Sequence, residues 1–376
     1  MAESTPTPNR GMTLADTLAM GPDQESQAAW LKKQNVNIDQ RIKLTRLSHM
    51  LYQHPDLEMI HQFLVDFGLQ VALRTDDEVW YEGYGPDLYV YYARKGTKKF
   101  LGGAFYSASW DDFQKTSKLP GAGEIEQLKD APGGGFLVTV TDPEGYPMNV
   151  VWGQAEVQPE STFCPEKVVL NFPQAAQVLH LHFFNIVPTD FVYMEQDGHR
   201  ISVTAFMHLD LGKEPVDHHP FFLCANPKGA HVHHSSYEVH DFDAQQLGHQ
   251  WLIEKGYRPA WGIGRHVLGS QIFDYWWDIS GNMVEHYADG DLVNAETPIG
   301  YMPAGEDSLA VWGPKVPGEF LGIRLLQLVT LYPSPQFLGA EAVFPVGTTT
   351  LSRIWYGTSP YLAATNHTVT VSADAS

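Results

Sequence analysis

The sequence predicts an α+β fold that repeats one unit, a strand followed by a helix and then by several further strands. Three observations lead to this prediction. Short runs rich in aromatic and β-branched residues dominate the chain, two amphipathic helices stand among them, and both halves space a strand, an aspartate and a helix in the same way. Recurrence of this kind along a chain is typical of duplicated modules.

The strands are predicted where aromatic or β-branched residues cluster: DLYVYYA (87–93), GFLVTV (135–140) and QIFDYWW (271–277). The two helices are predicted from apolar residues at helical spacing, and each series ends at a glycine, which suits a helix terminus. One covers Leu57–Phe67. The other covers Ala244–Lys255, with Leu247, Trp251 and Leu252 on its apolar face.

Each helix follows a strand at the same interval. From His49, the strand HMLYQ leads to Asp56 seven positions on and then to the first helix; from His234, the strand SSYEV leads to Asp241, again seven positions on, and then to the second helix. A weaker third copy starts at Lys167, where VVLNF runs into a proline as the first copy does. We therefore expect equivalent strand–helix pairs in both halves.

A hairpin of the form strand-DxxG-strand occurs twice. Asp142 begins one turn and Asp278 the other, with a glycine three positions on and Asn149 or Glu285 seven positions on. Turns of this kind are common, so each similarity alone could arise by chance, but together and in the same order they favour a duplication. The C-terminal hairpin carries Glu285 where the N-terminal one carries Asn149, so one half can bind a metal and the other cannot.

Composition excludes several classes of protein. The chain has 376 residues and a formal net charge of −20, which argues against a nucleic-acid partner because phosphate binding needs clustered Lys and Arg. Its two cysteines, Cys164 and Cys224, form no CxxC pair, so a disulfide scaffold or a cysteine zinc site is not expected. We find no secretory signal and no apolar run near the ~20 residues of a membrane span, and we expect a cytoplasmic protein.

The segment from His219 to Glu285 carries the residue types of a ferrous oxygenase, which holds iron with imidazoles and one carboxylate. His234 opens the strand HSSYEV, and Glu285 lies in the strand MVEHY after the hairpin. Adjacent strands of a curved sheet would aim both side chains at one point. A carboxylate on the concave face of such a sheet would be costly to bury without a cation.

Three further residues are expected around this pair. His219 lies fifteen positions before His234, across an expected hairpin at Asn226–Gly229, which would put it on the neighbouring strand as a general acid or base. Tyr275 and His266 would line the same cavity, where a phenol can hydrogen-bond a substrate oxygen and an imidazole can hold or donate a proton. Four nearby histidines are interpreted as surface or packed residues: His218, His231, His233 and His240.

Three segments carry a specific resemblance: HVHHSSYEV (231–239), GRHVLGSQIFDYWWD (264–278) and SGNMVEHYADGD (280–291). They resemble the C-terminal domain of the type I extradiol ring-cleavage dioxygenases, in the vicinal oxygen chelate superfamily, and the similarity spans about residues 40–320. It implies paired βαβββ modules that form two curved-sheet domains. It also implies Fe(II) held by His234 and Glu285, with His219 as acid or base and His266 and Tyr275 beside the substrate.

This resemblance gives the expected domain organisation. Its parts are a disordered tail (1–27), a metal-free chelate-fold domain (28–155), a metal-binding chelate-fold domain (156–320) and an extension (321–376) that is either a strand-rich layer or a poorly ordered tail. The family's first histidine ligand opens the third module, where this chain has Lys167. A lysine would have to lose its proton to bind a metal, and the nearest histidines, His180 and His182, fall in an expected helix.

The sequence thus predicts an Fe(II)-dependent dioxygenase that cleaves a catechol-type ring with O₂ in the catabolism of aromatic compounds. Its partners would be a small aromatic diol and O₂, with a homo-oligomer left open. Lys167 motivates the alternative of a metal-deficient chelate-fold protein that acts as a binding module or as a non-oxidative lyase or isomerase.

Overall fold

The computed structural model describes residues 24–155, 168–172, 182–196, 198–225, 231–305 and 308–320, with the backbone alone for 168–172. The expected extension 321–376 and most of the expected tail lie outside these residues. The end of that tail differs from expectation, because Gln24–Glu25 form strand β1 and helix α2 (Gln27–Lys33) follows directly. Pairing of β1 with a later strand and burial of Trp30 and Leu31 hold this segment in place.

The first half of the chain forms an eight-stranded sheet in the order β3-β4-β5-β2-β6-β9-β8-β7. Its strands are β2 (Leu44–His54), β3 (Gln70–Arg74), β4 (Glu78–Glu82), β5 (Tyr91–Lys95), β6 (Lys99–Ser107), β7 (Glu126–Gln127), β8 (Phe136–Thr141) and β9 (Pro147–Trp152). Its helices are α3 (Leu57–Asp66) and α4 (Trp110–Thr116), and a 3-10 turn (Ile38–Gln40) precedes it. The strand expected at 87–93 begins only at Tyr91.

The second half forms an eleven-stranded sheet in the order β1-β20-β11-β12-β14-β10-β15-β18-β17-β16-β21. Its other elements are β10 (Val168–Phe172), β11 (Ile186–Gln196), β12 (His199–Leu209), β14 (Phe221–Cys224), β15 (His234–Glu238), α6 (Phe242–Glu254), β16 (Pro259–His266), β17 (Ile272–Trp277), β18 (Met283–Ala288), β20 (Ile299–Pro303) and β21 (Ala310–Trp312). The short strands β13 (Val216–Asp217) and β19 (Leu292–Val293) pair with each other.

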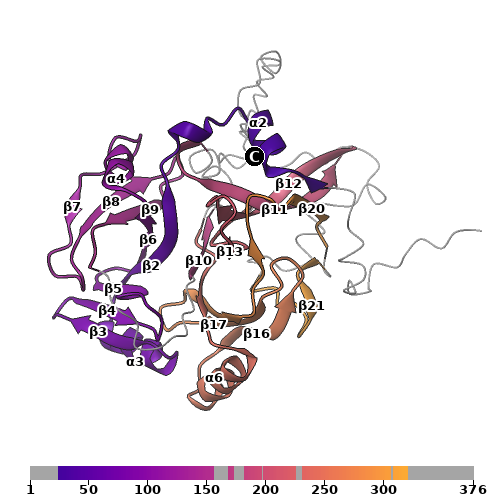
Figure 1. Ribbon diagram of the computed structural model, residues 1–376. Coiled ribbons are helices and arrows are strands. Elements are labelled where there is room, and N and C mark those ends of the chain that lie inside the picture. The colour runs from indigo at the N-terminus through magenta and orange to yellow at the C-terminus, as the bar shows by residue number, and fades with distance from the viewer. Residues whose placement is uncertain are drawn as a thin grey trace, which may run out of the picture.

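The first sheet contains two predicted βαβββ modules, β2-α3-β3-β4-β5 and β6-α4-β7-β8-β9, and the second contains a complete one, β15-α6-β16-β17-β18. Of the remaining module, the described residues give the strands β10, β11, β12 and β14. In the first, β2 pairs antiparallel with β6, and each of these pairs in parallel with the last strand of its own module, β5 or β9. In the second, β10 and β15 pair antiparallel, with β14 and β18 as their parallel partners. Figure 1 shows the two curled sheets side by side. The predicted fold class is therefore confirmed.

The two DxxG hairpins have the same local structure. Asp142 Oδ1 accepts hydrogen bonds from the backbone N–H of Glu144 and Tyr146, at 2.9 and 2.8 Å. Asp278 Oδ1 accepts the equivalent bonds at 2.8 and 2.7 Å. In both turns the glycine has a positive φ. Asn149 and Glu285 occupy equivalent strand positions, but the Asn149 amide bonds to Thr139 and the Leu101 carbonyl.

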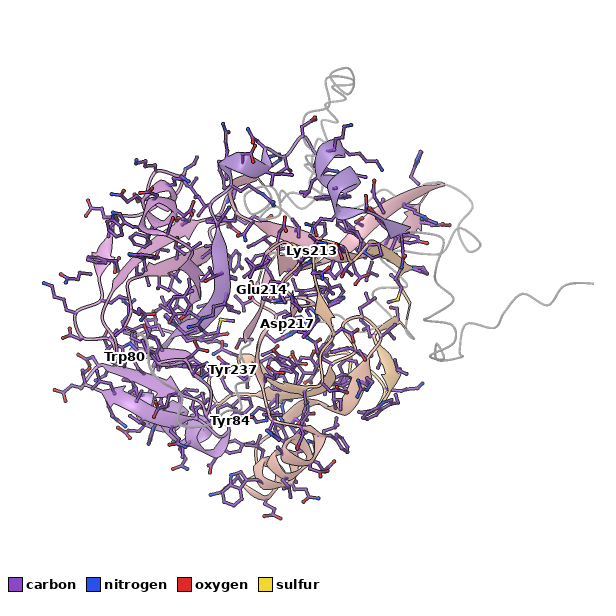
Figure 2. All side chains as sticks on the ribbon, viewed as in Figure 1. Trp80, Tyr84, Lys213, Glu214, Asp217 and Tyr237 are labelled. Atoms are coloured by element: carbon purple, nitrogen blue, oxygen red, sulfur yellow. The ribbon has the colours of Figure 1, made fainter. Side chains whose placement is uncertain are left out.

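The two halves share one apolar core. It includes Phe63 and Phe67 of α3 together with Tyr237 of β15 and Trp276 of β17. The rings of Phe67 and Tyr237 meet edge to face at 5.9 Å, and Figure 2 shows Tyr237 between the two halves. This core fixes the sheet that carries β15, β17 and β18 against the first half of the molecule.

Helix α6 lies on the outside of β16, β17 and β18, as Figure 1 shows. The prediction of its buried face is wrong in part, because Leu252 is buried but Leu247 and Trp251 are exposed. The side chain that faces the sheet is polar: Gln245 Nε2 donates to the carbonyls of Ile272 and His286, at 3.0 and 2.8 Å. None of the helices in the described part of the chain has the length and apolar character that crossing a bilayer requires.

Candidate metal centre

The strands β15 and β18 bring His234 and Glu285 together. The two strands run in parallel, with His234 opposite Met283 and Ser236 opposite Glu285. Side chains two positions apart on a strand share one face, so His234 and Glu285 project to the same side of the sheet. His234 Nε2 lies 3.5 Å from Glu285 Oε2, and both side chains are buried.

This geometry fits a bound divalent cation. Imidazole and carboxylate donors lie about 2.1 Å from a small divalent ion, so two of them at a tetrahedral angle are about 3.4 Å apart. Burial raises the pKa of Glu285 to about 8, and a hydrogen bond donated by the Ser236 hydroxyl opposes that rise. A cation between the two groups would keep the carboxylate ionised in this dry environment.

The tautomer of His234 follows from a chain of hydrogen bonds behind it. His234 Nδ1 lies 2.7 Å from His233 Nδ1, and His233 Nε2 lies 2.6 Å from the carbonyl oxygen of Phe320. The carbonyl only accepts, so His233 donates through Nε2–H and its Nδ1 accepts from His234. His234 therefore carries its proton on Nδ1 and presents the Nε2 lone pair toward Glu285, as a metal ligand must.

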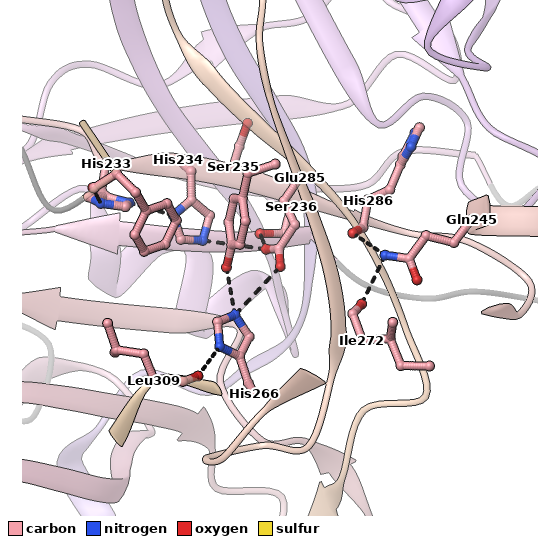
Figure 3. Close-up of polar contacts among 12 residues, drawn as sticks. His233, His234, Ser235, Ser236, Gln245, His266, Ile272, Glu285, His286 and Leu309 are labelled. Atoms are coloured by element: carbon pink, nitrogen blue, oxygen red, sulfur yellow. Dashed lines mark hydrogen bonds and ion pairs between the residues drawn. The ribbon is translucent and has the colours of Figure 1, made fainter. Parts of the chain in front are cut away.

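His266, at the end of β16, and Tyr275, on β17, lie beside this pair. Tyr275 is directly opposite Glu285, and its hydroxyl lies 2.8 Å from His266 Nε2. His266 Nδ1 lies 2.8 Å from the Leu309 carbonyl and so donates to it, which makes Nε2 the acceptor from Tyr275. His266 Nε2 is also 4.0 Å from Glu285 Oε1, and Figure 3 shows the ring between Glu285 and Leu309.

The histidines of the site are held neutral. Burial lowers the pKa of His266 to about 4. It holds the pKa of His234 well below its usual range, and the neighbouring histidines, His219 among them, lower it further. Burial also raises the pKa of the Tyr275 phenol well above its ordinary value. The site thus offers unprotonated imidazole nitrogens and a protonated phenol at neutral pH.

His219 reaches this cluster by a different route from the one predicted. It lies two residues before β14, and β10 lies between β14 and β15, so the prediction of neighbouring strands for His219 and His234 is wrong. The reason is that β10, from far earlier in the chain, pairs with both β14 and β15. His219 is nevertheless buried, and the positive charges of His218 and His266 would lower its pKa further.

An aromatic cluster surrounds the site. Trp261 stacks on Tyr275 with ring centroids 5.9 Å apart, and Phe320 meets Tyr275 edge to face at 4.7 Å. Phe221 and Trp276 belong to the core shared by the two halves. Phe206 meets His219 edge to face at 4.8 Å, so aromatic side chains lie beside both Tyr275 and His219.

Within the described residues, no third His, Cys, Asp or Glu joins His234 and Glu285 to complete a metal site. Lys167, at the expected first ligand position, and His180 lie outside those residues, and so does the expected hairpin at 226–229. Strand β10 begins at Val168 and pairs with β15, the strand of His234.

No family model matches the sequence. Metapyrocatechase 2 of Cupriavidus necator is 31% identical over 302 residues, which cover 73% of this chain and 91% of that protein. The chain belongs to the type I extradiol ring-cleavage dioxygenases of the vicinal oxygen chelate superfamily. It is thus a ring-cleavage dioxygenase, an oxidoreductase.

Solved structures share the fold of this dioxygenase. Homoprotocatechuate 2,3-dioxygenase from Brevibacterium fuscum, in an anaerobic substrate complex, aligns with a TM-score of 0.65 at 18% identity, covering 75% of this chain and 93% of that one. A Mn(II)-bound glyoxalase from Novosphingobium aromaticivorans aligns with a TM-score of 0.63 at 18% identity, covering 83% of this chain and 99% of that one.

Two further residues of the dioxygenase belong to the site, although the sequence did not indicate a role for them. His233 and His218, interpreted as surface or packed residues, are hydrogen-bonded to His234 and His219. Their signal in the sequence is the repeated pair of adjacent histidines, HH, at 218–219 and 233–234. The other two neighbours, His231 and His240, are exposed.

Proposed function

We propose that this dioxygenase binds Fe(II) through His234 and Glu285 in the domain 156–320 and cleaves a catechol-type ring next to its two hydroxyls with O₂. The observation that supports it is the 3.5 Å approach of His234 Nε2 to Glu285 Oε2 in a buried site. When bound, the ferrous ion would supply one open centre at which the diol and O₂ meet. The low cysteine content favours a cytoplasmic location.

The residues around the pair would handle protons and position the ring. His219 is buried and neutral, so it is suited to take a proton from a substrate hydroxyl. Tyr275 keeps its phenolic proton, which it donates to His266 Nε2 in this structure and would redirect to a substrate oxygen when the substrate binds. His266, fixed by the Leu309 carbonyl, would hold the phenol in place until then. The aromatic cluster around Tyr275 would limit access of water.

The test is a comparison of two isosteric variants. Glu285→Gln removes the proposed carboxylate ligand, whereas Asp274→Asn makes the same change at a buried carboxyl on the opposite face of β17, where Asp274 accepts from His249 and Trp276. After anaerobic loading with ferrous iron, we expect Glu285→Gln to retain far less iron than the wild type and Asp274→Asn to retain as much. Equal iron content in wild type and Glu285→Gln would contradict the assignment.

Oxygen uptake tests the reaction itself. The iron-loaded enzyme should consume dissolved oxygen when catechol is added and should form a product that retains both oxygen atoms of O₂. A protein that binds catechol while dissolved oxygen stays constant would contradict the proposal and favour the non-oxidative alternative.

A further inference from the structure

His219 is the first member of a chain of three hydrogen-bonded side chains. Its Nδ1 lies 2.8 Å from Nδ1 of His218, and Nε2 of His218 lies 2.6 Å from Oδ2 of Asp190 on β11. His218 is almost fully buried, whereas the Asp190 side chain is 16% exposed. The chain therefore leads from the buried histidine cluster toward the edge of the protein.

The positions of the protons follow from the acceptor at the end. An ionised carboxylate only accepts, so His218 donates to Asp190 through Nε2–H. A neutral His218 then has its lone pair on Nδ1 and accepts from Nδ1–H of His219. His219 is left with its lone pair on Nε2, which is the nitrogen that remains for a substrate.

Two glycines leave room for this arrangement. A Cβ on Gly269 would lie 3.0 Å from both His218 Nδ1 and His219 Cε1, and its φ of +76° also suits glycine alone. A Cβ on Gly300, which pairs with Asp190 across β20 and β11, would lie 2.0 Å from Asp190 Oδ1. A side chain at position 269 would displace the rings of His218 and His219, and one at position 300 would displace the Asp190 carboxylate.

Hydrogen bonds also hold the backbone of His218 in place. Thr189 Oγ1 donates to the backbone carbonyl of His218 at 2.6 Å and accepts from Nδ1 of His208, at 2.7 Å. The backbone N–H of His218 donates to the Asp291 carbonyl at 3.1 Å. The titratable groups that interact with the His218–His219 pair are His208, His234, His266 and Asp190.

We propose that His218 and Asp190 form a proton relay behind His219, an inference that rests on the proposed role of His219 as base. A substrate O–H proton passes to His219 Nε2, the Nδ1–H proton of His219 passes to His218 Nδ1, and the Nε2–H proton of His218 passes to Asp190 Oδ2. Both rings end neutral, and the partly exposed carboxyl returns its proton to solvent. Each bond that breaks leaves its electron pair on oxygen or nitrogen, and each new N–H or O–H bond uses a lone pair, so no oxidant is needed. Passage of a proton back along the same path to the product restores the starting tautomers of both rings.

The relay removes a difficulty that His219 would have as an isolated base. Burial and nearby histidines disfavour a cationic ring at this position, so a proton held there would be costly. Passing the proton to Asp190 places it on a carboxylate closer to water. His218 and Asp190 are accordingly positioning and relay residues, and His219 alone touches the substrate.

Asp190→Asn tests the relay because it keeps the size of the side chain and removes its basicity. We expect unchanged iron content and KM for catechol, and a fall in kcat of at least about tenfold. In this variant, kcat should increase with the concentration of a small buffer base, because the base replaces Asp190 as the proton acceptor. The matched control is Asp112→Asn, whose side chain is 10% exposed and pairs with Lys115 on α4 in the first half of the chain. Equal kcat values in Asp190→Asn and Asp112→Asn would overturn the proposal.

Two further measurements separate failure of the relay from failure of the proposed function. Nitrogen-15 NMR of the metal-free protein, with His219 assigned from a His219→Gln variant, should show His219 protonated on Nδ1; protonation on Nε2 would overturn the relay whatever the activity. Gly300→Ala should displace Asp190 and reproduce the kcat loss, and full activity in that variant would also count against it. Absence of oxygen uptake in the wild type would instead refute the proposed function.

Discussion

Metal binding to the metal-free dioxygenase should release about one proton at pH 7. Burial raises the pKa of Glu285 from its ordinary value of 4.5 to about 8, so at pH 7 about nine molecules in ten carry the protonated carboxyl. His234 and His266 are already neutral and release none. The affinity for Fe(II) should therefore rise about tenfold per pH unit up to pH 7 and level off above about pH 8.5.

Anaerobic calorimetric titration with Fe(II), in two buffers of different ionisation enthalpy, measures this proton count. Glu285→Gln should abolish the release, and Asp274→Asn should keep it. Metal uptake with equal affinity at pH 6 and pH 8 and no proton release would refute the reasoning. Release of about two protons would require a second protonated ligand, as the ammonium of Lys167 would be.

The same pKa governs the pH dependence of stability. In the unfolded chain the Glu285 carboxyl ionises near pH 4.5, but in the metal-free fold it keeps its proton to about pH 8. The folded state thus binds more protons between these values, and stability of the metal-free protein falls as pH rises through them. The gap in Tm between iron-loaded and metal-free protein should widen from pH 6 to pH 8, and a constant gap would contradict the assignment.

Three further predictions concern single side chains. His233→Leu removes the acceptor for His234 Nδ1–H and should weaken iron binding about 10- to 100-fold in competition with a chelator, with unchanged affinity counting against the orienting role. Tyr275→Phe should keep full iron content and lower kcat for catechol about 10²-fold, and an unaltered kcat would exclude a catalytic hydrogen bond. Asp142→Ala removes two hydrogen bonds to backbone N–H groups in the first half of the chain and should lower the free energy of unfolding in urea by about 2–4 kcal/mol, with iron content unchanged. Equal stability would show that the turn forms without them.

Much of the architecture could be read from local patterns. The duplicated strand–helix units and the paired hairpins at Asp142 and Asp278 were predictable because capping and turn residues act within a few positions of themselves. The approach of His234 and Glu285 was predictable because the spacing put each on a strand of the same module. Their roles as ligands stay predictions, as do those of His219, His266 and Tyr275.

The errors came from long-range packing. The buried face of α6 was misassigned because Gln245 satisfies strand carbonyls there, while Leu247 lies in solvent. The strand beside His234 was misassigned because β10 enters the sheet from more than 60 positions away in sequence, and no local spacing reports such pairing.

The sequence by itself determined the module, its turns and the types of side chain that reach the concave face, because periodicity and turn chemistry are local. Only the tertiary structure decided which nitrogen of each histidine faces the site. That choice depends on acceptors far along the chain: the Phe320 carbonyl for His234, through His233, and the Asp190 carboxylate for His219, through His218. Imidazole tautomers follow hydrogen-bond partners, and folding alone brings those partners within reach.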